Sequence, residues 1–213
     1  MRRWARALVM TLSVLSLAVW CGSCALANAN DEIWILIDDN DSTLDIYRGD
    51  TRIEHFEPVA LGRGGTARVR QRGSRMTPTG EFHINRINRD SKFNIFLGLD
   101  YPKLDTAREA MRAGLMSPTE YADFQDAYYR DGAPPQDTVL GGYIGIHGLG
   151  SSDPEIHRRF NWTEGCVAVT NDQIEKLTRL VSIGTRVVIR GDDDAPIAAL
   201  HDKPQVDSRT LTD

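Results

Sequence analysis

The feature that most constrains the fold is a series of short apolar segments with the two-residue period of a half-buried β-strand. Within residues 43–48, Leu44 and Ile46 alternate with Asp45 and Tyr47, as expected when successive side chains of a strand point to opposite faces. Turn residues or glycines bound these segments. Strands are expected at residues 32–38, 43–48, 52–61, 81–87, 141–148 and 185–190. The pattern predicts a domain that is mainly β.

Helical signals interrupt the strands within residues 103–131. Thr106 and Glu109 have the spacing of a capping box, which predicts a first helix there. Ser117 and Glu120 have the same spacing, with a proline at the first helical position, and predict a second helix.

A third helix is expected after Thr170, where Gln173 completes another capping box. Ile174 and Leu177 belong to its buried stripe, and Gly184 is expected to end it. The predicted fold class is therefore mainly β with helical insertions, an α+β fold.

The first 29 residues have the composition of a secretory signal peptide. Three arginines precede an apolar run, residues 7–20, which is short for a membrane span, so no stable span is expected. Small residues at alternate positions favour cleavage after Ala29, with Ala27 as the alternative. We therefore expect an exported protein of the periplasm or cell wall.

This cleavage separates the three cysteines of the chain. Cys21 and Cys24 leave with the signal peptide, so their spacing is not a redox motif. Anchoring as a lipoprotein through Cys24 ranks behind simple secretion, because the leucine usually found three places upstream is missing. The mature chain keeps one thiol, Cys166, in a compartment that oxidises thiols. A lone thiol there indicates chemistry, whereas a buried, inert cysteine is the structural alternative.

The mature chain is acidic. Loss of the three N-terminal arginines reduces 25 basic residues to 22 against 30 acidic residues, which leaves a net charge of −8. This charge argues against a nucleic-acid partner. The length suits one catalytic domain, which we place at residues 30–191. Residues 192–213 begin with three aspartates and are mostly polar, which predicts a disordered acidic tail.

A histidine and a cysteine, each next to a glycine, form the candidate reactive pair. His147 ends an apolar strand and is followed by Gly148, while Gly165 precedes Cys166. A catalytic thiol needs a nearby base. Glycine before the thiol permits an unusual backbone angle that turns N–H groups toward an oxyanion. We expect His147 to be the base and to depress the pKa of the thiol; His157 lies in a charged segment that is expected to be exposed.

The spacing of these residues resembles the signature of the L,D-transpeptidase catalytic domain (YkuD) family. His147-Gly148 is followed, after 14 residues, by Thr163-Glu164-Gly165-Cys166, where the family has Ser/Thr-His-Gly-Cys. The segment 77–82 is similar to the family's Thr-Pro-x-Gly-x-Phe segment, and the similarity covers most of residues 32–190. The resemblance implies the family's β-sandwich or barrel.

Two positions depart from the common form of the family motif. Glu164 stands where the family usually has histidine, and Ala168 stands where an arginine usually follows the cysteine by two places. That arginine can hold a substrate carboxylate. Arg70, Arg72 and Arg75 of a basic loop are candidates to replace it, although a solvated loop is the more ordinary interpretation. Some members of a branch that shares both departures are thought to hydrolyse bonds to peptidoglycan.

The resemblance implies the chemistry of a peptidoglycan-modifying cysteine acyltransferase. His147 takes the proton of Cys166, the thiolate attacks the carbonyl of the third residue of a stem peptide, and D-alanine leaves. An amine or water then resolves the thioester. Supporting residues are expected to hold the oxyanion, brace the loop or contact the substrate, and they are Gly165, Thr163, Gly148, Glu164 and Tyr143.

Other functions stay open at this level. With water as acceptor, the protein would be an amidase or a carboxypeptidase on the same acyl-enzyme. A wall-binding module with a dead cysteine is a further alternative. A metal site made of His147, His157 and Cys166 matches no common zinc spacing, and neither a metal nor a cofactor is expected. The expected partners are peptidoglycan stem peptides, with a wall-linked amine or a lipoprotein as acceptor.

Overall fold

The computed structural model describes residues 31–191 of the 213-residue chain. The expected signal peptide, residues 1–29, and the expected tail, residues 192–213, lie outside this part. Within it, no helix combines the length and the apolar character needed to cross a membrane. The elements in chain order are β1 (Ile33–Asp38), β2 (Thr43–Arg48), β3 (Thr51–Phe56), β4 (Thr66–Ala67), β5 (Thr77–Pro78), β6 (Gly80–Ser91), β7 (Asn94–Leu99), α1 (Leu104–Arg112), α2 (Pro118–Asp131), β8 (Gly145–His147), α3 (Pro154–Arg159), β9 (Val167–Ala168), α4 (Asn171–Leu180) and β10 (Arg186–Arg190).

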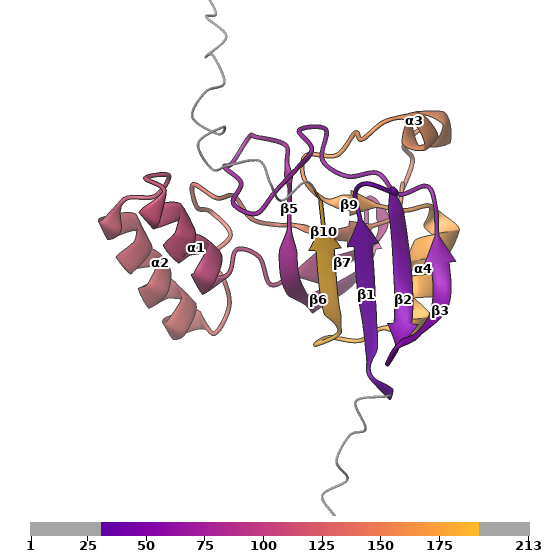
Figure 1. The fold of residues 1–213 in the computed structure, drawn as a ribbon, viewed down its shortest axis with the longest axis horizontal. Helices are drawn as coiled ribbons and strands as arrows, with labels where there is room; N and C mark the ends of the chain where they lie inside the picture. The colour runs from indigo at the N-terminus through magenta and orange to yellow at the C-terminus, as the bar shows by residue number, and fades with distance from the viewer. Residues whose placement is uncertain (1–30, 192–213) are drawn as a thin grey trace, which may run out of the picture.

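Eight strands of the described residues form one sheet in the order β3-β2-β1-β10-β6-β7-β8-β9. Figure 1 shows β3, β2, β1 and β10 side by side. Most neighbours are antiparallel, whereas β1 runs parallel to β10 and β8 runs parallel to β9. In the first hairpin, Ile35 pairs with Ile46 and Ile37 pairs with Leu44. All four side chains are fully buried. The alternation in the sequence therefore turns one face of this hairpin into the core.

The long strand β6 joins two halves of this sheet. Its first residues pair with β10, and its later residues pair with β7. Two backbone hydrogen bonds between Ala60 and Ala168, of 3.0 and 2.7 Å, then link the segment after β3 to β9. They bring the two edges of the sheet together, which is how a sheet closes on itself. The expected fold class, mainly β with helical insertions, is confirmed.

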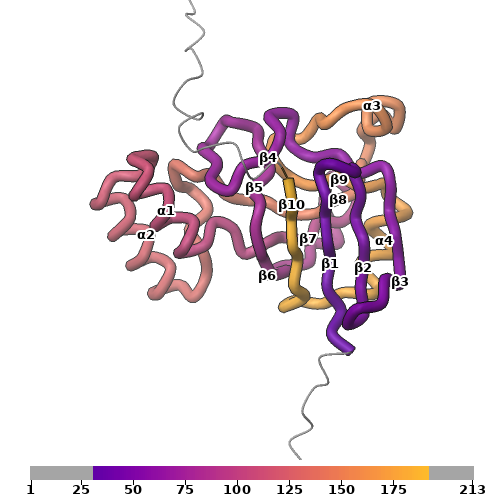
Figure 2. The backbone as a smooth tube through the Cα atoms, viewed as in Figure 1, coloured from indigo at the N-terminus to yellow at the C-terminus, as the bar shows by residue number. Residues whose placement is uncertain are grey.

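The helices α1 and α2 pack against each other and project to one side of the sheet, as Figure 2 shows. The predicted capping box of α2 is confirmed. The Ser117 hydroxyl accepts a hydrogen bond from the Glu120 N–H, and the Glu120 carboxylate accepts one from the Ser117 N–H.

The capping box predicted at Thr106 is wrong. The helix α1 begins one residue after Lys103, and no side chain caps it. The Asp105 carboxylate accepts the Thr106 N–H, while Glu109 forms an ion pair with Arg68 of the basic loop. A neighbouring acid and a distant arginine therefore occupy the groups that the capping box would have used.

The helix α4 packs against β7 and β8 and so supports the strand that carries His147. Its predicted capping box, between Thr170 and Gln173, is confirmed. Gly184 does not end the helix, because α4 stops at Leu180 and Gly184 lies in the turn before β10 with a φ of +92°.

The strand predicted over residues 141–148 is shorter than expected. Only Gly145 to His147 form β8, because Gly141 and Tyr143 have φ values of +74° and +56°. Left-handed backbone of this kind does not fit a strand. The residues before β8 are therefore a loop, and this loop forms one wall of the site described next.

Candidate active site

The strand pair β8 and β9 brings the two candidate reactive residues together. The parallel register pairs His147 with Ala168. Cys166 directly precedes β9, so this register sets it beside Gly145, two residues before the level of His147. Because alternate residues of a strand share a face, Cys166 and His147 lie on the same face of the strand pair.

The backbone before the thiol has a conformation that only glycine adopts easily. Gly165 has a φ of +126°. A Cβ atom at this position would lie 2.3 Å from Nη1 of Arg70 and 2.7 Å from the carbonyl oxygen of Met76. Both the angle and the lack of space therefore require glycine.

Thr163 closes the same loop through its hydroxyl. Its Oγ1 accepts a hydrogen bond from the Gly165 N–H at 3.0 Å and donates one to the Cys166 carbonyl oxygen at 2.6 Å. The Thr163 side chain therefore holds both Gly165 and Cys166 in the turn. One consequence is that the Gly165 N–H is already engaged and is not free to bind an oxyanion, which corrects that part of the role expected of Gly165.

His147 is buried, with 2 % of its surface exposed. Its Nδ1 lies 2.7 Å from the carbonyl oxygen of Gly148, and because a carbonyl oxygen only accepts, Nδ1 carries the proton in the neutral ring. The ring stacks on Phe93 at 4.2 Å and meets the edge of Trp162 at 6.0 Å. This arrangement leaves the Nε2 lone pair as the basic position.

The resting pair is a neutral thiol and a neutral imidazole. Burial raises the pKa of the Cys166 thiol to about 11, although the Gly145 backbone and the charge of Arg70 act in the opposite direction. Burial likewise lowers the pKa of His147. The expectation that His147 depresses the thiol pKa is therefore wrong, because a low-dielectric setting disfavours both charged forms.

The thiol is part-buried and lines a cavity of about 400 Å³. It donates a hydrogen bond to the Tyr143 carbonyl oxygen at 3.5 Å, and among the described residues it has no hydrogen bond to His147. Tyr143 itself has an exposed side chain at the rim. The cavity is lined by Arg70, Arg72, Gly73, Gln136, Asp137, Gly141, Gly142, Tyr143, Ile144, Glu164 and Cys166.

Glu164, which replaces the family's usual histidine, is an exposed residue with two cationic partners. It forms ion pairs with Arg63 and with Arg75, the latter at 3.4 Å. Its negative charge is therefore balanced by the basic loop. Ala168, at the position of the usual arginine, is fully buried and held by the backbone of Ala60.

His157 is buried, so the prediction that it is exposed is wrong. The short helix α3 turns Ile156 outward and His157 inward. The His157 Nε2 lies 3.1 Å from the Pro58 carbonyl oxygen, and its Nδ1 accepts a hydrogen bond from the Trp162 indole at 3.4 Å. Both ring nitrogens are therefore occupied, and the residue links α3 to the segment after β3.

The part of the chain from residue 31 to residue 191 brings no three His, Cys, Asp or Glu side chains together as metal ligands. The reading of His147, His157 and Cys166 as a metal site therefore has no geometric basis there. Gln136 is a cavity residue that the sequence did not reveal: its amide oxygen accepts the Tyr143 N–H at 2.6 Å, and its amide nitrogen donates to the Tyr101 carbonyl.

Solved structures of low sequence identity share the fold with this chain, over part of their own length. Pgp2, described as the helical cell shape determining protein from Campylobacter jejuni, matches at a TM-score of 0.51 and 18% identity, over 75% of this chain and 48% of that chain. Bd1075 from Bdellovibrio bacteriovorus matches at 0.49 and 20% identity, over 78% of this chain and 50% of that chain. An L,D-transpeptidase from Mycobacterium smegmatis matches at 0.45 and 13% identity, over 75% of this chain and 59% of that chain.

The chain thus spans about half the length of the solved chains it matches. No curated protein sequence matches it. The sequence model of the L,D-transpeptidase catalytic domain (YkuD) matches residues 32–189, which is most of the chain. Because this match covers most of the chain, the chain belongs to the L,D-transpeptidase catalytic domain (YkuD) family.

Proposed function

We propose that the chain is a cysteine acyltransferase that modifies peptidoglycan stem peptides through a thioester on Cys166. Family membership supports an L,D-transpeptidase-like function on peptidoglycan. The observation that carries the finer proposal is the placement of Cys166 at a cavity, beside the strand of His147, whose Nδ1 is held by the Gly148 carbonyl. Since the substrate is in the wall, the proposal includes export, in keeping with the expected signal peptide.

The acylation step begins with the neutral pair. The thiol turns from the Tyr143 carbonyl toward His147, whose Nε2 takes the proton as Sγ attacks the carbonyl carbon of the third stem residue. The amide C–N bond then breaks, and the leaving D-alanine amine takes the proton from His147. The product is a thioester between Cys166 and the stem peptide, with His147 neutral again.

The tetrahedral intermediate needs a donor for its oxyanion. The Gly165 N–H is donated to Thr163, so in this mechanism the Cys166 N–H is the backbone donor. Thr163 also holds the Cys166 carbonyl, which keeps this peptide unit in place. Pre-organised donors of this kind lower the barrier because they need no rearrangement as the charge develops.

Resolution of the thioester by an amine makes the protein a transpeptidase, and we favour this outcome. Resolution by water makes it an amidase or carboxypeptidase. The observation that favours this second candidate is Ala168: its buried position against Ala60 leaves no arginine at the place where the common motif holds a carboxylate. The acceptor in the transfer reaction is a wall-linked amine or a lipoprotein amine.

The test is incubation of the mature protein, residues 30–213, with tetrapeptide muropeptides, with and without an added amine acceptor. Mass spectrometry distinguishes the outcomes. Peptide dimers or amine adducts support transfer, whereas shortened peptides or a released wall-linked amine support hydrolysis. Cys166→Ala is the matched control, and we expect it to fold normally and to form no product.

Substantial product from Cys166→Ala would contradict the proposal, because a methyl group cannot form the thioester. Labelling by a small thiol probe separates the remaining alternative, a wall-binding module with a dead cysteine. If Cys166 reacts with the probe while neither kind of product appears, the assumed donor peptide is wrong. If the protein binds peptidoglycan without either reaction, the binding module is the better description.

A further inference from the structure

Arg70 is a buried cation that forms no ion pair with any residue from 31 to 191. Its residue surface is 5 % exposed, and its Nε has no hydrogen-bond partner among the described residues. The other arginines of the loop differ in this respect. Arg63 and Arg75 pair with Glu164, and Arg72 pairs with Asp137.

Such a group is costly to bury unless an anion meets it. A guanidinium in a protein interior stays protonated and is normally paired with a carboxylate or phosphate. Burial lowers the pKa of Arg70, which the nearby Tyr101, Cys166 and Glu164 only partly oppose. Within residues 31–191, no carboxylate pairs directly with this positive charge.

The guanidinium lies in the cavity of Cys166, between two glycines. It lines the same 400 Å³ cavity as the thiol. A Cβ atom on Gly165 would lie 2.3 Å from Nη1, and a Cβ atom on Gly141 would lie 3.8 Å from Nη2. Both glycines have positive φ values, of +126° and +74°. The loop before β8 and the loop before β9 thus leave room for Arg70 beside the nucleophile.

The resting thiol is not the partner that balances this charge. Arg70 lowers the thiol pKa, yet burial dominates and the pKa still stands at about 11. Tyr101 is no anion either, because burial raises its pKa far above neutral pH and its hydroxyl donates to the Leu140 carbonyl. A substrate group with two acceptor oxygens matches the planar fork of a guanidinium better than either.

We propose that Arg70 is a binding site for a peptide carboxylate in the Cys166 cavity and sets the preference for acidic over amidated stem peptides. The identity of the peptide rests on the function proposed above. Two carboxylates are near the attacked bond: that of the leaving D-alanine, and that on the side chain of a diaminopimelate third residue. The chemistry is the same for both, and peptides amidated at one or the other position distinguish them.

The experiment measures binding in the Cys166→Ala background, where no turnover occurs. Titration calorimetry compares a tetrapeptide with both carboxylates free, the peptide amidated at its terminus, and the peptide amidated on the third side chain. We expect one amide to bind on the order of tenfold more weakly than the acid, as for loss of a charge-assisted hydrogen bond. In the Cys166→Ala, Arg70→Gln protein this ratio should fall to about 1.

Arg72→Gln is the matched control, because Arg72 lines the same cavity but is exposed and paired with Asp137. It should keep the preference for the acid. Arg70→Lys, which retains the charge without the fork, should keep part of it. Thermal melting checks that Arg70→Gln folds. If it does not fold, Arg70→Lys and the comparison of peptides on the Arg70 protein still decide the question.

Equal binding of the acid and both amides by the Arg70 protein would overturn the carboxylate site, as would a preference that survives Arg70→Gln. Failure of all three peptides to bind at millimolar concentration would overturn it as well. Because Cys166 is absent from these proteins, the ratio is independent of catalysis. Product formation by the unmodified protein tests the proposed function separately.

Discussion

His147 and His55 carry the same imidazole in opposite surroundings. His147 is buried on β8, with Nδ1 on the Gly148 carbonyl, and burial lowers its pKa. His55 is on β3 with 38 % of its side chain exposed. Its Nδ1 lies 2.6 Å from Asp45 and its Nε2 lies 3.5 Å from Glu57. The hydrogen bond to Asp45 is the largest cause of the raised pKa of His55, with Glu57 adding to it.

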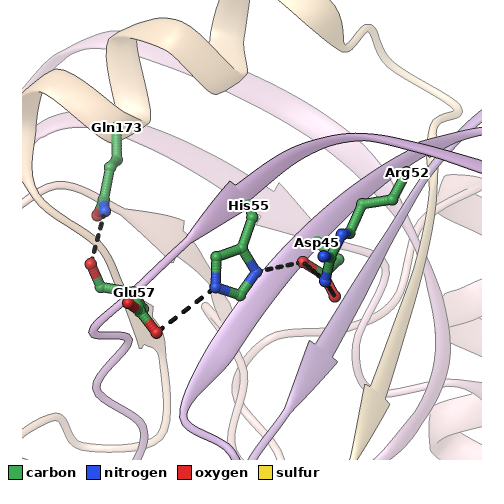
Figure 3. A network of polar contacts seen from close by, with 5 residues as sticks. All are labelled: Asp45, Arg52, His55, Glu57 and Gln173. Atoms are coloured by element: carbon green, nitrogen blue, oxygen red, sulfur yellow. Dashed lines mark hydrogen bonds and ion pairs between the residues drawn. The ribbon is translucent and has the colours of Figure 1, made fainter.

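This difference in surroundings gives the two rings different roles. A neutral imidazole with one free lone pair is a proton acceptor, whereas an imidazole held between two carboxylates links the segments that carry them. Figure 3 shows this link: Asp45 of β2 also lies 3.4 Å from Arg52, and the Glu57 carbonyl accepts a hydrogen bond from Gln173 of α4 at 3.2 Å. His55 thus ties the edge strand to its neighbour, and it stands two residues before Glu57, whose carbonyl contacts α4.

The largest expected effect separates the two rings by activity. His147→Gln should lower product formation from stem peptides by about 10²- to 10⁴-fold, the usual contribution of a general base. His55→Gln should leave the rate within about twofold, since the network in Figure 3 has no contact with Cys166. Rates are measured on proteins shown to fold by circular dichroism. Similar losses in both variants would break the comparison.

The pH profile of the same reaction sharpens the comparison between His147 and His55. The base has to be neutral, and the pKa of His147 lies below its ordinary value of 6.5. As pH falls, the loss of activity should therefore have its midpoint below pH 6.5. An acid limb in kcat/KM centred above pH 7 would mean that the histidine gains its proton too easily to be this buried ring.

A third histidine tests whether burial alone makes a base. His157 is as buried as His147, but both of its nitrogens are occupied. His157→Ala should lower the free energy of unfolding by about 2 kcal/mol, because the Pro58 carbonyl and the Trp162 N–H lose a partner. Urea unfolding measures this, with Ile156→Ala on the exposed side of α3 as control. A shift of the pH profile of Cys166 alkylation in His157→Ala would transfer the role of base to His157.

The smallest expected effect is a pH-dependent stability from His55. Its pKa is raised in the folded protein above the ordinary value of 6.5. The contribution of His55 to the free energy of unfolding is therefore fully present below pH 6.5 and is lost as pH rises through its pKa in the folded protein. The gap in unfolding free energy between the unmodified protein and His55→Gln should stay within about 1 kcal/mol, because solvent screens the pair. It should shrink with rising pH and in 0.5 M salt, and a gap that grows above pH 7 would contradict the raised pKa of His55.

Features set by neighbours in the sequence were predictable. The alternation of Leu44 and Ile46 with polar residues predicted β2, and the capping boxes at Ser117 and Thr170 predicted the starts of α2 and α4. In each case the interacting groups lie within a few residues, so no distant segment has to be known. The same rule failed at Thr106, where the distant Arg68 engages Glu109.

The glycine next to Cys166 and the hydrogen bond from Thr163 to the Cys166 carbonyl oxygen, three residues along, are also local. The motif by itself therefore determined the shape of the nucleophile loop and pointed to the family. Charge and burial around it were decided only by the tertiary structure. His157 is buried because it meets Pro58, 99 residues away. In the described part of the chain Arg70 forms no ion pair, because Glu164 is engaged by Arg63 and Arg75 of the loop. The pKa of a group depends on the dielectric and the charges around it in space, and these come from segments that the chain order does not place side by side.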